Sequence, residues 1–301
     1  MIFEGIIPPV ITPLHDDHSI DEDGFAAVIE YMIEGGVYGI IVGGTTGEFY
    51  ALSPEERIRQ FQFAGDIING RAQFVCGVND ISTAAACAYG EAARDAGADG
   101  LLVAAPYYSL PTEQENAAHC LAIDKAAGLP IMLYNYPGRT GVSMGEDYLD
   151  LVSKSPNIKA IKEASGDINR LHLLANNYPG IELSCGAEDQ ALEFFVWGAT
   201  SWVTPMGNFF AEEVVALYDA CVKEQNFVKA RRIMAALLEL TSVLEGGGQL
   251  IQCTKFACQF FDLPAGTVRP PLKSLPEADM ENLRDVLTSA RSDIQAILAE
   301  A

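Results

Sequence analysis

The stretch PIMLYNYPGRTGVSMGEDYLDLVSKSPNIKAIK, residues 130–162, decides the fold. The apolar run Pro130–Tyr134 predicts a buried strand, Glu146–Ser153 a helix, and Asn157–Lys162 a second strand that ends at a lysine. A strand, a crossover helix and a following strand form a unit in which the two strands are parallel. The stretch therefore predicts one βαβ unit of an α/β fold.

The same alternation continues on both sides of this unit. Further strands are predicted at Gly5–Thr12, Tyr38–Val42, Gln73–Cys76, Gly100–Ala104, Ile181–Ser184 and Ser201–Thr204. Helices are predicted between them at Asp21–Gly35, Ser82–Ala96, Glu113–Ala127, Ile168–Asn177 and Asp189–Gly198, from Ala211 onward, and after a capping box formed by Ser53, Pro54 and Glu56. Eight such units in succession predict a (β/α)8 TIM barrel.

A doubly wound open sheet is the alternative fold, although it usually has fewer strands. No glycine-rich dinucleotide fingerprint follows the first strand, and we expect no cofactor. From residue 226 the pattern is helical only, at Asn226–Leu244, Leu250–Phe261 and Met280–Leu298. We therefore expect a barrel catalytic domain of residues 1–225 followed by a C-terminal helical domain of residues 226–301.

Charge and cysteine content restrict the partners and the compartment. The 301 residues include 19 Lys and Arg against 41 Asp and Glu, a net charge of −22. Such a surface repels nucleic acids and anionic membranes, and we expect neither as a partner. Seven cysteines without a CxxC pair, and no signal peptide, predict reduced thiols in a cytoplasmic protein.

Active sites of such barrels lie at the carboxyl ends of the strands, so the residue that ends each predicted strand is a candidate. Lys162 ends the sixth strand, and alternation places it on the same face as Ile158 and Ala160, with Lys159 toward the helices. On an inward face the amine is desolvated, which lowers its pKa and allows it to attack a carbonyl group as a nucleophile. The alternative is a surface lysine beyond the rim of the barrel.

Two other strand ends carry groups that suit this chemistry. Tyr134 ends the strand before that of Lys162, and its phenol can relay protons. Thr45 and Thr46 follow the second strand in a glycine-rich loop, which can offer N–H and hydroxyl groups to a carboxylate. The alternatives are an interior aromatic residue and a tight turn that needs glycine.

With these residues assembled, the sequence resembles the dihydrodipicolinate synthase and N-acetylneuraminate lyase superfamily from Gly5 to about Leu275. The resemblance lies in four motifs: Gly44-Thr45-Thr46-Gly47-Glu48, Pro106-Tyr107-Tyr108, Tyr134-Asn135-x-Pro137-x-Arg139-Thr140-Gly141 and Ile161-Lys162-Glu163-Ala164-Ser165-Gly166. It implies a homotetrameric lyase on a TIM barrel, whose small-molecule substrate is pyruvate or another 2-oxo acid.

The resemblance also implies a role for each matching residue. Lys162 would form a Schiff base with the 2-oxo acid. Tyr134 and Thr45 would relay protons, together with Tyr108 from a neighbouring subunit. Thr46 and Gly47 would bind the carboxylate, and the backbone at Gly186 and Val203 would line the pocket. Arg139 matches the arginine that binds the carboxylate of aspartate semialdehyde in the synthases, which implies formation of 4-hydroxy-tetrahydrodipicolinate in lysine biosynthesis.

Several alternatives stay open at this point. Phe49 and Tyr50 stand where typical synthases carry small residues, which favours an aldolase or dehydratase of 2-keto-3-deoxy sugar acids, or a pyrroline-carboxylate deaminase of the hydroxyproline pathway. A sensor that binds a 2-oxo acid without turnover is a second class. A metal enzyme is a third, with candidate ligands in His15-Asp16-Asp17-His18, although we expect no metal site.

Overall fold

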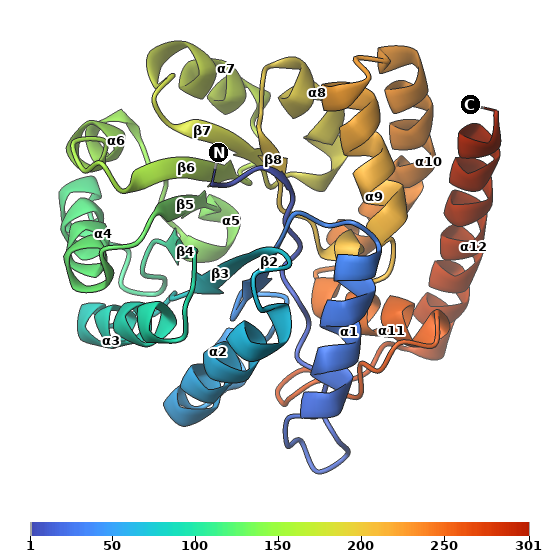
Figure 1. The fold of residues 1–301 in the computed structure, drawn as a ribbon, viewed down its shortest axis with the longest axis horizontal. Coiled ribbons are helices and arrows are strands. Elements are labelled where there is room, and N and C mark those ends of the chain that lie inside the picture. The colour runs from blue at the N-terminus through green and yellow to red at the C-terminus, as the bar shows by residue number, and fades with distance from the viewer. Residues whose placement is uncertain (1, 301) are drawn as a thin grey trace.

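The computed structural model describes residues 2–300, and within them eight parallel strands form one sheet (Figure 1). Each strand pairs with its neighbours in the order β1-β8-β7-β6-β5-β4-β3-β2. The strands are β1 Gly5–Ile6, β2 Gly39–Val42, β3 Gln73–Gly77, β4 Gly100–Ala104, β5 Ile131–Asn135, β6 Ile158–Glu163, β7 Glu182–Cys185 and β8 Ser201–Trp202.

The sheet closes on itself between β1 and β2. The Tyr38 N–H donates to the Ile6 carbonyl at 2.9 Å, and the Ile41 N–H donates to the Pro8 carbonyl at 2.9 Å. The predicted (β/α)8 barrel is therefore confirmed, and the open sheet is wrong. The first strand is shorter than the predicted Gly5–Thr12, because Pro8 and Pro9 have no N–H to continue a ladder.

Helices surround the barrel as Figure 1 shows. They are α1 Glu22–Glu34, α2 Pro54–Ile68, α3 Thr83–Asp95, α4 Glu113–Ala127, the single turn α5 Pro137–Thr140, α6 Glu146–Val152, α7 Ile168–Asn177, α8 Ala191–Val196 and α9 Ala211–Tyr218. The predicted capping box is confirmed: the Glu56 N–H donates to Ser53 Oγ at 3.2 Å, and the Ser53 N–H donates to Glu56 Oε2 at 2.7 Å. The predicted helix Asp189–Gly198 is split, since Glu188–Gln190 forms a 3₁₀ turn before α8.

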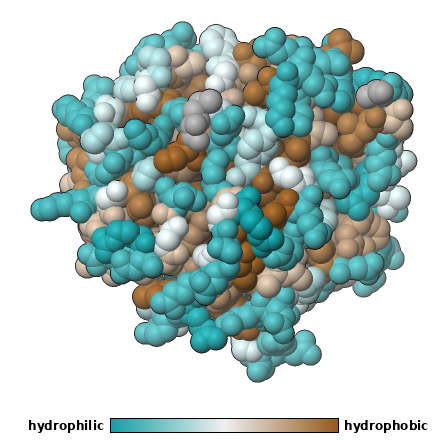
Figure 2. Space-filling model, in the orientation of Figure 1, coloured by the Kyte–Doolittle hydropathy of each residue, from teal (hydrophilic) through white to brown (hydrophobic). Residues whose placement is uncertain are grey.

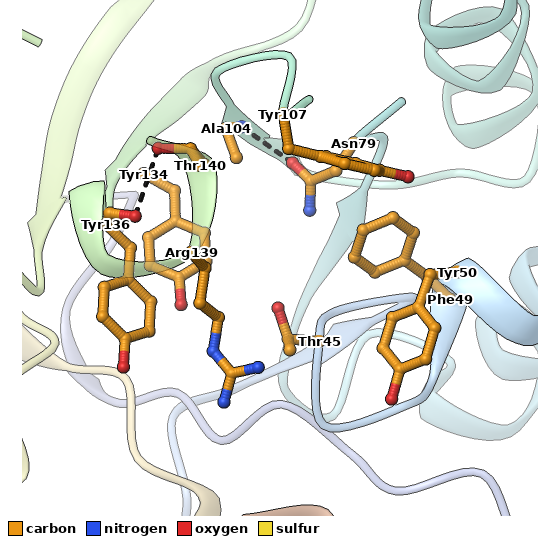
Figure 3. A pocket seen from close by; sticks show the side chains of 10 residues that line it. All are labelled: Thr45, Phe49, Tyr50, Asn79, Ala104, Tyr107, Tyr134, Tyr136, Arg139 and Thr140. Carbon is orange, nitrogen blue, oxygen red and sulfur yellow. Dashed lines mark hydrogen bonds between the residues drawn. The ribbon is translucent and has the colours of Figure 1, made fainter. Parts of the chain in front are cut away.

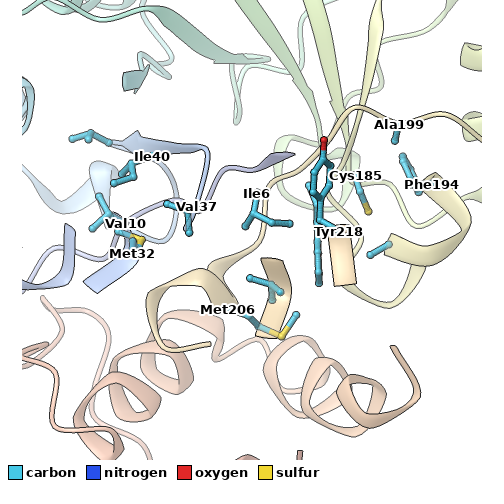
Figure 4. Packing of buried hydrophobic residues seen from close by; sticks show 14 of the residues in the cluster. Ile6, Val10, Met32, Val37, Ile40, Cys185, Phe194, Ala199, Met206 and Tyr218 are labelled. Carbon is cyan, nitrogen blue, oxygen red and sulfur yellow. The ribbon is translucent and has the colours of Figure 1, made fainter. Parts of the chain in front are cut away.

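Two groups of buried apolar side chains hold the barrel together. One group fills the barrel interior and includes Leu102, Met132 and Ala160. The other lies between the sheet and the helices, and Figure 4 shows part of it around Ile6 and Met206. Ile158 belongs to this second group, so its predicted place on the inner face with Lys162 is wrong.

The pairing of β5 with β6 explains this correction. Ile131 pairs with Ile158, but Met132 pairs with Ala160, so Lys159 is an extra residue in β6. A bulge of this kind changes which face the following residues occupy. Ala160 and Lys162 still share the inner face, and Lys159 is exposed.

The last part of the chain forms α10 Phe227–Gly246, α11 Leu250–Phe260 and α12 Glu277–Ala299. Leu237 of α10 and Ile294 of α12 belong to the same buried group as Phe25 of α1. The helices are continuous with the core of the barrel, and the domain boundary between residues 225 and 226 stays a prediction.

The visible surface is largely hydrophilic. Figure 2 shows hydrophilic residues spread over one face, with hydrophobic residues scattered among them. Among the helices of residues 2–300, none is both long and apolar enough to cross a membrane. All seven cysteines are free.

A buried ion pair connects the loop after β2 to the C-terminal helices. Lys255 Nζ of α11 lies 2.6 Å from Glu48 Oε1, and the two side chains are 3% and 1% exposed. The other oxygen of Glu48 accepts from the Arg269 N–H at 2.9 Å. Glu48 has a positive φ of 56°, so these contacts hold a left-handed residue directly after Thr45-Thr46-Gly47.

Replacing Lys255 with Met is expected to lower the free energy of unfolding by about 3–5 kcal/mol, because a buried carboxylate loses its partner. Chemical denaturation of both proteins measures the difference. The control is Arg232→Met, which breaks the exposed pair of Arg232 with Glu300 and should cost about 1 kcal/mol or less. Equal losses in the two variants would contradict the role assigned to the buried pair.

Candidate active site

One cavity collects side chains from the carboxyl ends of several strands. Thr45 and Thr46 follow β2, Tyr134 ends β5, Lys162 lies in β6, Gly186 follows β7 and Pro205 follows β8. Tyr136, Arg139, Glu188, Glu245 and Leu250 complete much of its wall. We call this space the lysine cavity. Its position is the one at which barrels of this type carry their active sites.

Lys162 forms part of the wall of this cavity. It pairs with Tyr134 across β5 and β6, and its Nζ lies 4.2 Å from the centre of the Tyr134 ring. The Lys162 side chain is only 8% exposed. The structure therefore confirms that Lys162 points inward and lies next to Tyr134.

Gly186 makes this position possible. A Cβ atom at residue 186 would lie 2.7 Å from Cε of Lys162, closer than real atoms approach. The missing side chain lets the lysine stem lie against the backbone after β7. Gly186 therefore contributes to the cavity through its lack of a side chain as well as through its backbone.

Burial sets the protonation of Lys162. It lowers the pKa of the ammonium group from its ordinary value to about 8, and the carboxyl groups of Glu188 and Glu245 oppose this shift. The amine is consequently neutral in a useful fraction of molecules near neutral pH. A neutral amine of this kind is a nucleophile toward carbonyl carbon.

Tyr134 stays a neutral phenol. Burial raises its pKa well above the ordinary value, while the charge of Arg139 and the nearby hydroxyl of Thr45 act in the opposite direction. The structure thus places Thr45 and Tyr134 in the same cavity wall. A neutral hydroxyl pair can pass a proton from one oxygen to the other.

Arg139 lies on a single helical turn. Pro137 stands at its first position, where its fixed φ favours a helix, and Gly141 ends it at a φ of 75°. The turn is anchored by Thr140 Oγ1, which donates to the Tyr136 carbonyl at 3.1 Å. This anchoring holds the exposed guanidinium of Arg139 at the mouth of the lysine cavity.

A second cavity of about 260 Å³ adjoins the first and shares Thr45, Tyr134, Tyr136 and Arg139 with it. We call it the aromatic cavity. Figure 3 shows Tyr134, Tyr136 and Arg139 on one side and Phe49, Tyr50 and Tyr107 on the other. Among them the Asn79 side chain accepts from the Ala104 N–H at 2.7 Å.

A buried polar network fixes the loops after β5 and β6. Asn135 Nδ2 donates to Glu163 Oε2 at 2.8 Å, and the Ser165 N–H donates to Glu163 Oε1 at 2.8 Å. The Met144 N–H donates to Asn135 Oδ1 at 3.0 Å. Satisfied buried networks hold their members rigidly. The network of Asn135 and Glu163 therefore holds the loops that follow Tyr134 and Lys162.

Two carboxyl groups of the lysine cavity were not predicted from the sequence as site residues. Glu188 follows β7 and is 3% exposed, whereas Glu245 lies near the end of α10 on the rim. Burial raises the pKa of both, that of Glu188 to about 8. Glu188 could have been found by its place after a predicted strand. Glu245 carries no such signal, since it belongs to the helical region.

Three predicted site residues lie away from this wall. Tyr108 is 92% exposed and has a φ of 68°. Val203 is fully buried in the barrel interior, and Gly47 lies in the loop below the cavity, where its carbonyl accepts from Thr12 Oγ1 at 2.7 Å. Thr46, in contrast, is part of the wall.

The histidine and aspartate run in the first βα loop forms no ligand set. Among residues 2–300, no group of three or more His, Cys, Asp or Glu side chains is placed to hold a metal ion. His15 Nε2 lies 3.9 Å from Asp21 Oδ1, the residue that caps α1. The contact between His15 and Asp21 therefore lies at the N-terminus of α1.

Comparison with known proteins identifies the relatives of this chain. The model of the dihydrodipicolinate synthetase family matches residues 2–290. The chain belongs to this family. A 4-hydroxy-tetrahydrodipicolinate synthase from Salinibacter ruber is 37% identical, covering 79% of this chain and 86% of its own length. The synthase of that name from Methanoculleus marisnigri is 34% identical over 96% of this chain and 99% of its own length.

Solved structures of the dihydrodipicolinate synthetase family agree with the fold. The 4-hydroxy-tetrahydrodipicolinate synthase from Methylacidiphilum fumariolicum SolV has a TM-score of 0.94 and 30% identity, covering 99% of both chains. A prophage protein of the family from E. coli K12, solved in complex with pyruvate, has a TM-score of 0.92 and 28% identity, covering 97% of this chain and 99% of that one.

The pKa of Lys162 is open to direct measurement. Labelling of its amine by a small aldehyde and a borane reductant should rise with pH to half its maximum near pH 8, because the amine is neutral above its pKa. Peptide mass spectrometry follows the labelling, and the exposed Lys159 serves as the reagent control. A midpoint near the value of an ordinary lysine, about 10.4, would contradict the effect of burial.

Proposed function

We propose that this chain is a 4-hydroxy-tetrahydrodipicolinate synthase, a Schiff-base lyase that condenses pyruvate with aspartate semialdehyde. The observation that carries the proposal is the buried amine of Lys162, which faces Tyr134 in a cavity that also includes Arg139. The curated relatives reported above carry this activity in their names. They do not favour the sugar-acid and pyrroline-carboxylate alternatives.

The first half of the reaction uses Lys162. Its neutral amine attacks the keto carbon of pyruvate, a C–N bond forms, and the keto oxygen leaves as water to give an imine. Thr46 in the cavity wall holds the carboxylate of pyruvate, whereas the N–H of Gly47 already donates to the Gly44 carbonyl at 3.1 Å. Loss of a proton from the methyl carbon then gives an enamine, and Tyr134 and Thr45 carry that proton.

The second half joins the enamine to the aldehyde. The methyl-derived carbon attacks the aldehyde carbon, a C–C bond forms, and the new oxyanion takes a proton through Tyr134. Arg139 binds the carboxylate of the aldehyde, since a guanidinium pairs with a carboxylate in two-point geometry. The amino group of the product then displaces Lys162 from the imine and closes the ring.

We propose further that the enzyme is a homotetramer in which Tyr108 completes the site of a neighbouring copy. Tyr108 is exposed, and its left-handed backbone conformation costs free energy in a residue other than glycine. The aromatic cavity beside Thr45 and Tyr134 has the lining that would receive a phenol. The seven free cysteines support a cytoplasmic location for this assembly.

A substrate panel tests the activity. Borohydride added with pyruvate should inactivate the enzyme and leave a reduced adduct on the Lys162 peptide, and Lys162→Ala should form none. Pyruvate should be consumed with aspartate semialdehyde, and not with 2-keto-3-deoxygluconate, N-acetylneuraminate or the pyrroline-carboxylate acid. Binding of pyruvate without turnover on any of these would instead favour a sensor.

Subunit mixing tests the role of Tyr108. Tyr108→Phe should lower kcat about 100-fold or more without a change in melting temperature, because the phenol acts on a partner's substrate. Mixed oligomers of Lys162→Ala and Tyr108→Phe should regain part of the activity, since some sites then hold both intact groups. An active monomer in ultracentrifugation would refute the proposal.

A further inference from the structure

Glu188 is a buried carboxyl group in the same cavity as the proposed nucleophile. It follows β7 at the start of a 3₁₀ turn, and it lines the lysine cavity together with Lys162 and Gly186. Its side chain is 3% exposed, and its Oε2 has no hydrogen-bond partner among residues 2–300. A buried polar atom without a partner is costly, which indicates a ligand or a chemical role.

We propose that Glu188 is a catalytic acid of imine formation, which stores the proton that Lys162 gives up and delivers it to the departing oxygen of the substrate. This inference rests on the proposed Schiff-base chemistry and adds a residue to it. Thr45, Tyr134 and Tyr108 serve the proton transfers of carbon–carbon bond formation, whereas Glu188 serves the departure of water during imine formation.

The charge balance of the cavity supports this role. Burial lowers the pKa of Lys162 to about 8 and raises that of Glu188 to about 8. One proton is thus shared by the pair, either as ammonium with carboxylate or as amine with carboxylic acid. The second form contains a nucleophile and an acid at once, and neither of its groups carries a charge that burial would penalise.

Imine formation by Lys162 and Glu188 then needs no acid from outside the cavity. The Lys162 amine forms the C–N bond, and one of its protons moves to the former keto oxygen. The C–O bond of this hydroxyl breaks as the carboxylic acid of Glu188 protonates it, and water leaves. The products are an iminium cation and the Glu188 carboxylate, which attract each other in a medium of low dielectric constant.

Other titratable groups surround the pair. Glu245 of α10 and Tyr136 line the cavity together with Lys162, whereas Cys185 of β7 belongs to the buried group between the sheet and the helices. Burial is the main cause of the raised pKa of Glu188 and the like charge of Glu245 adds to it, whereas the nearby Thr204 and Trp202 oppose it. Burial raises the pKa of the Cys185 thiol well above its ordinary value, so this thiol does not compete as the acid.

Single-turnover trapping of pyruvate by borohydride, measured from pH 6 to about 10, tests the proposal. The wild-type rate should rise as Lys162 loses its proton and fall as Glu188 loses its own, which gives a bell centred near pH 8. Glu188→Gln should lower the maximum about 100-fold and abolish the falling limb, because an amide does not lose a proton in this range. Glu188→Asp should restore part of the rate and the bell.

The control is Glu193→Gln, an exposed glutamate of α8 that should behave as the wild type. A Glu188→Gln rate equal to that of the wild type, or a slow variant that keeps the falling limb, would overturn the inference while leaving the proposed function intact. A wild-type protein that forms no pyruvate adduct would instead refute the proposed function.

A second measurement needs no variant. Infrared difference spectra of the wild-type enzyme with and without pyruvate, using glutamate labelled with ¹³C at the side-chain carboxyl, should show the loss of a protonated carboxyl band when the imine forms. Unchanged carboxyl bands would overturn the inference, even if Glu188→Gln failed to fold.

Discussion

The exclusion of water from one amine is the interaction on which the site depends. Lys162 stays 8% exposed because three neighbours cover most of its side chain: the Tyr134 ring, the backbone at Gly186 and the wall that carries Glu188. An ammonium in such surroundings is costly, and the lysine therefore gives up its proton at a lower pH than it would in water. The proposed reaction begins with the attack of that neutral nitrogen on the keto carbon, and the later steps follow from the imine it forms.

The remainder of the structure keeps this arrangement rigid. The network of Asn135 and Glu163 fixes the loops after β5 and β6, and the single turn at Pro137–Thr140 aims Arg139. The loop of Thr45 and Thr46 is held from below by Glu48, which is bound by Lys255 and by the Arg269 backbone. The C-terminal helices thus contribute to the site through the loop that they anchor and through Glu245 on the rim.

Much of this arrangement could be predicted from the sequence, and the remainder depends on packing. Strand-to-helix alternation is local, so the barrel, its strand ends and the pairing of Tyr134 with Lys162 follow from it. The bulge at Lys159 does not follow from this alternation, because a bulge depends on the neighbouring strand. The sequence pattern therefore predicts the wrong face for Ile158. The burial of Glu188 and the approach of Glu245 depend on contacts with β8 and α10 that no local pattern contains.

The anchoring of Glu48 has a consequence for the order of events on the ribosome. Glu48 and its partner Arg269 are 221 residues apart in the chain. Synthesis proceeds from the N-terminus, so the loop with Thr45 and Thr46 emerges long before the segment that fixes it. A nascent chain can therefore contain all eight strands and Lys162 while still lacking a shaped carboxylate site, and it gains this site only when the last quarter of the polypeptide docks.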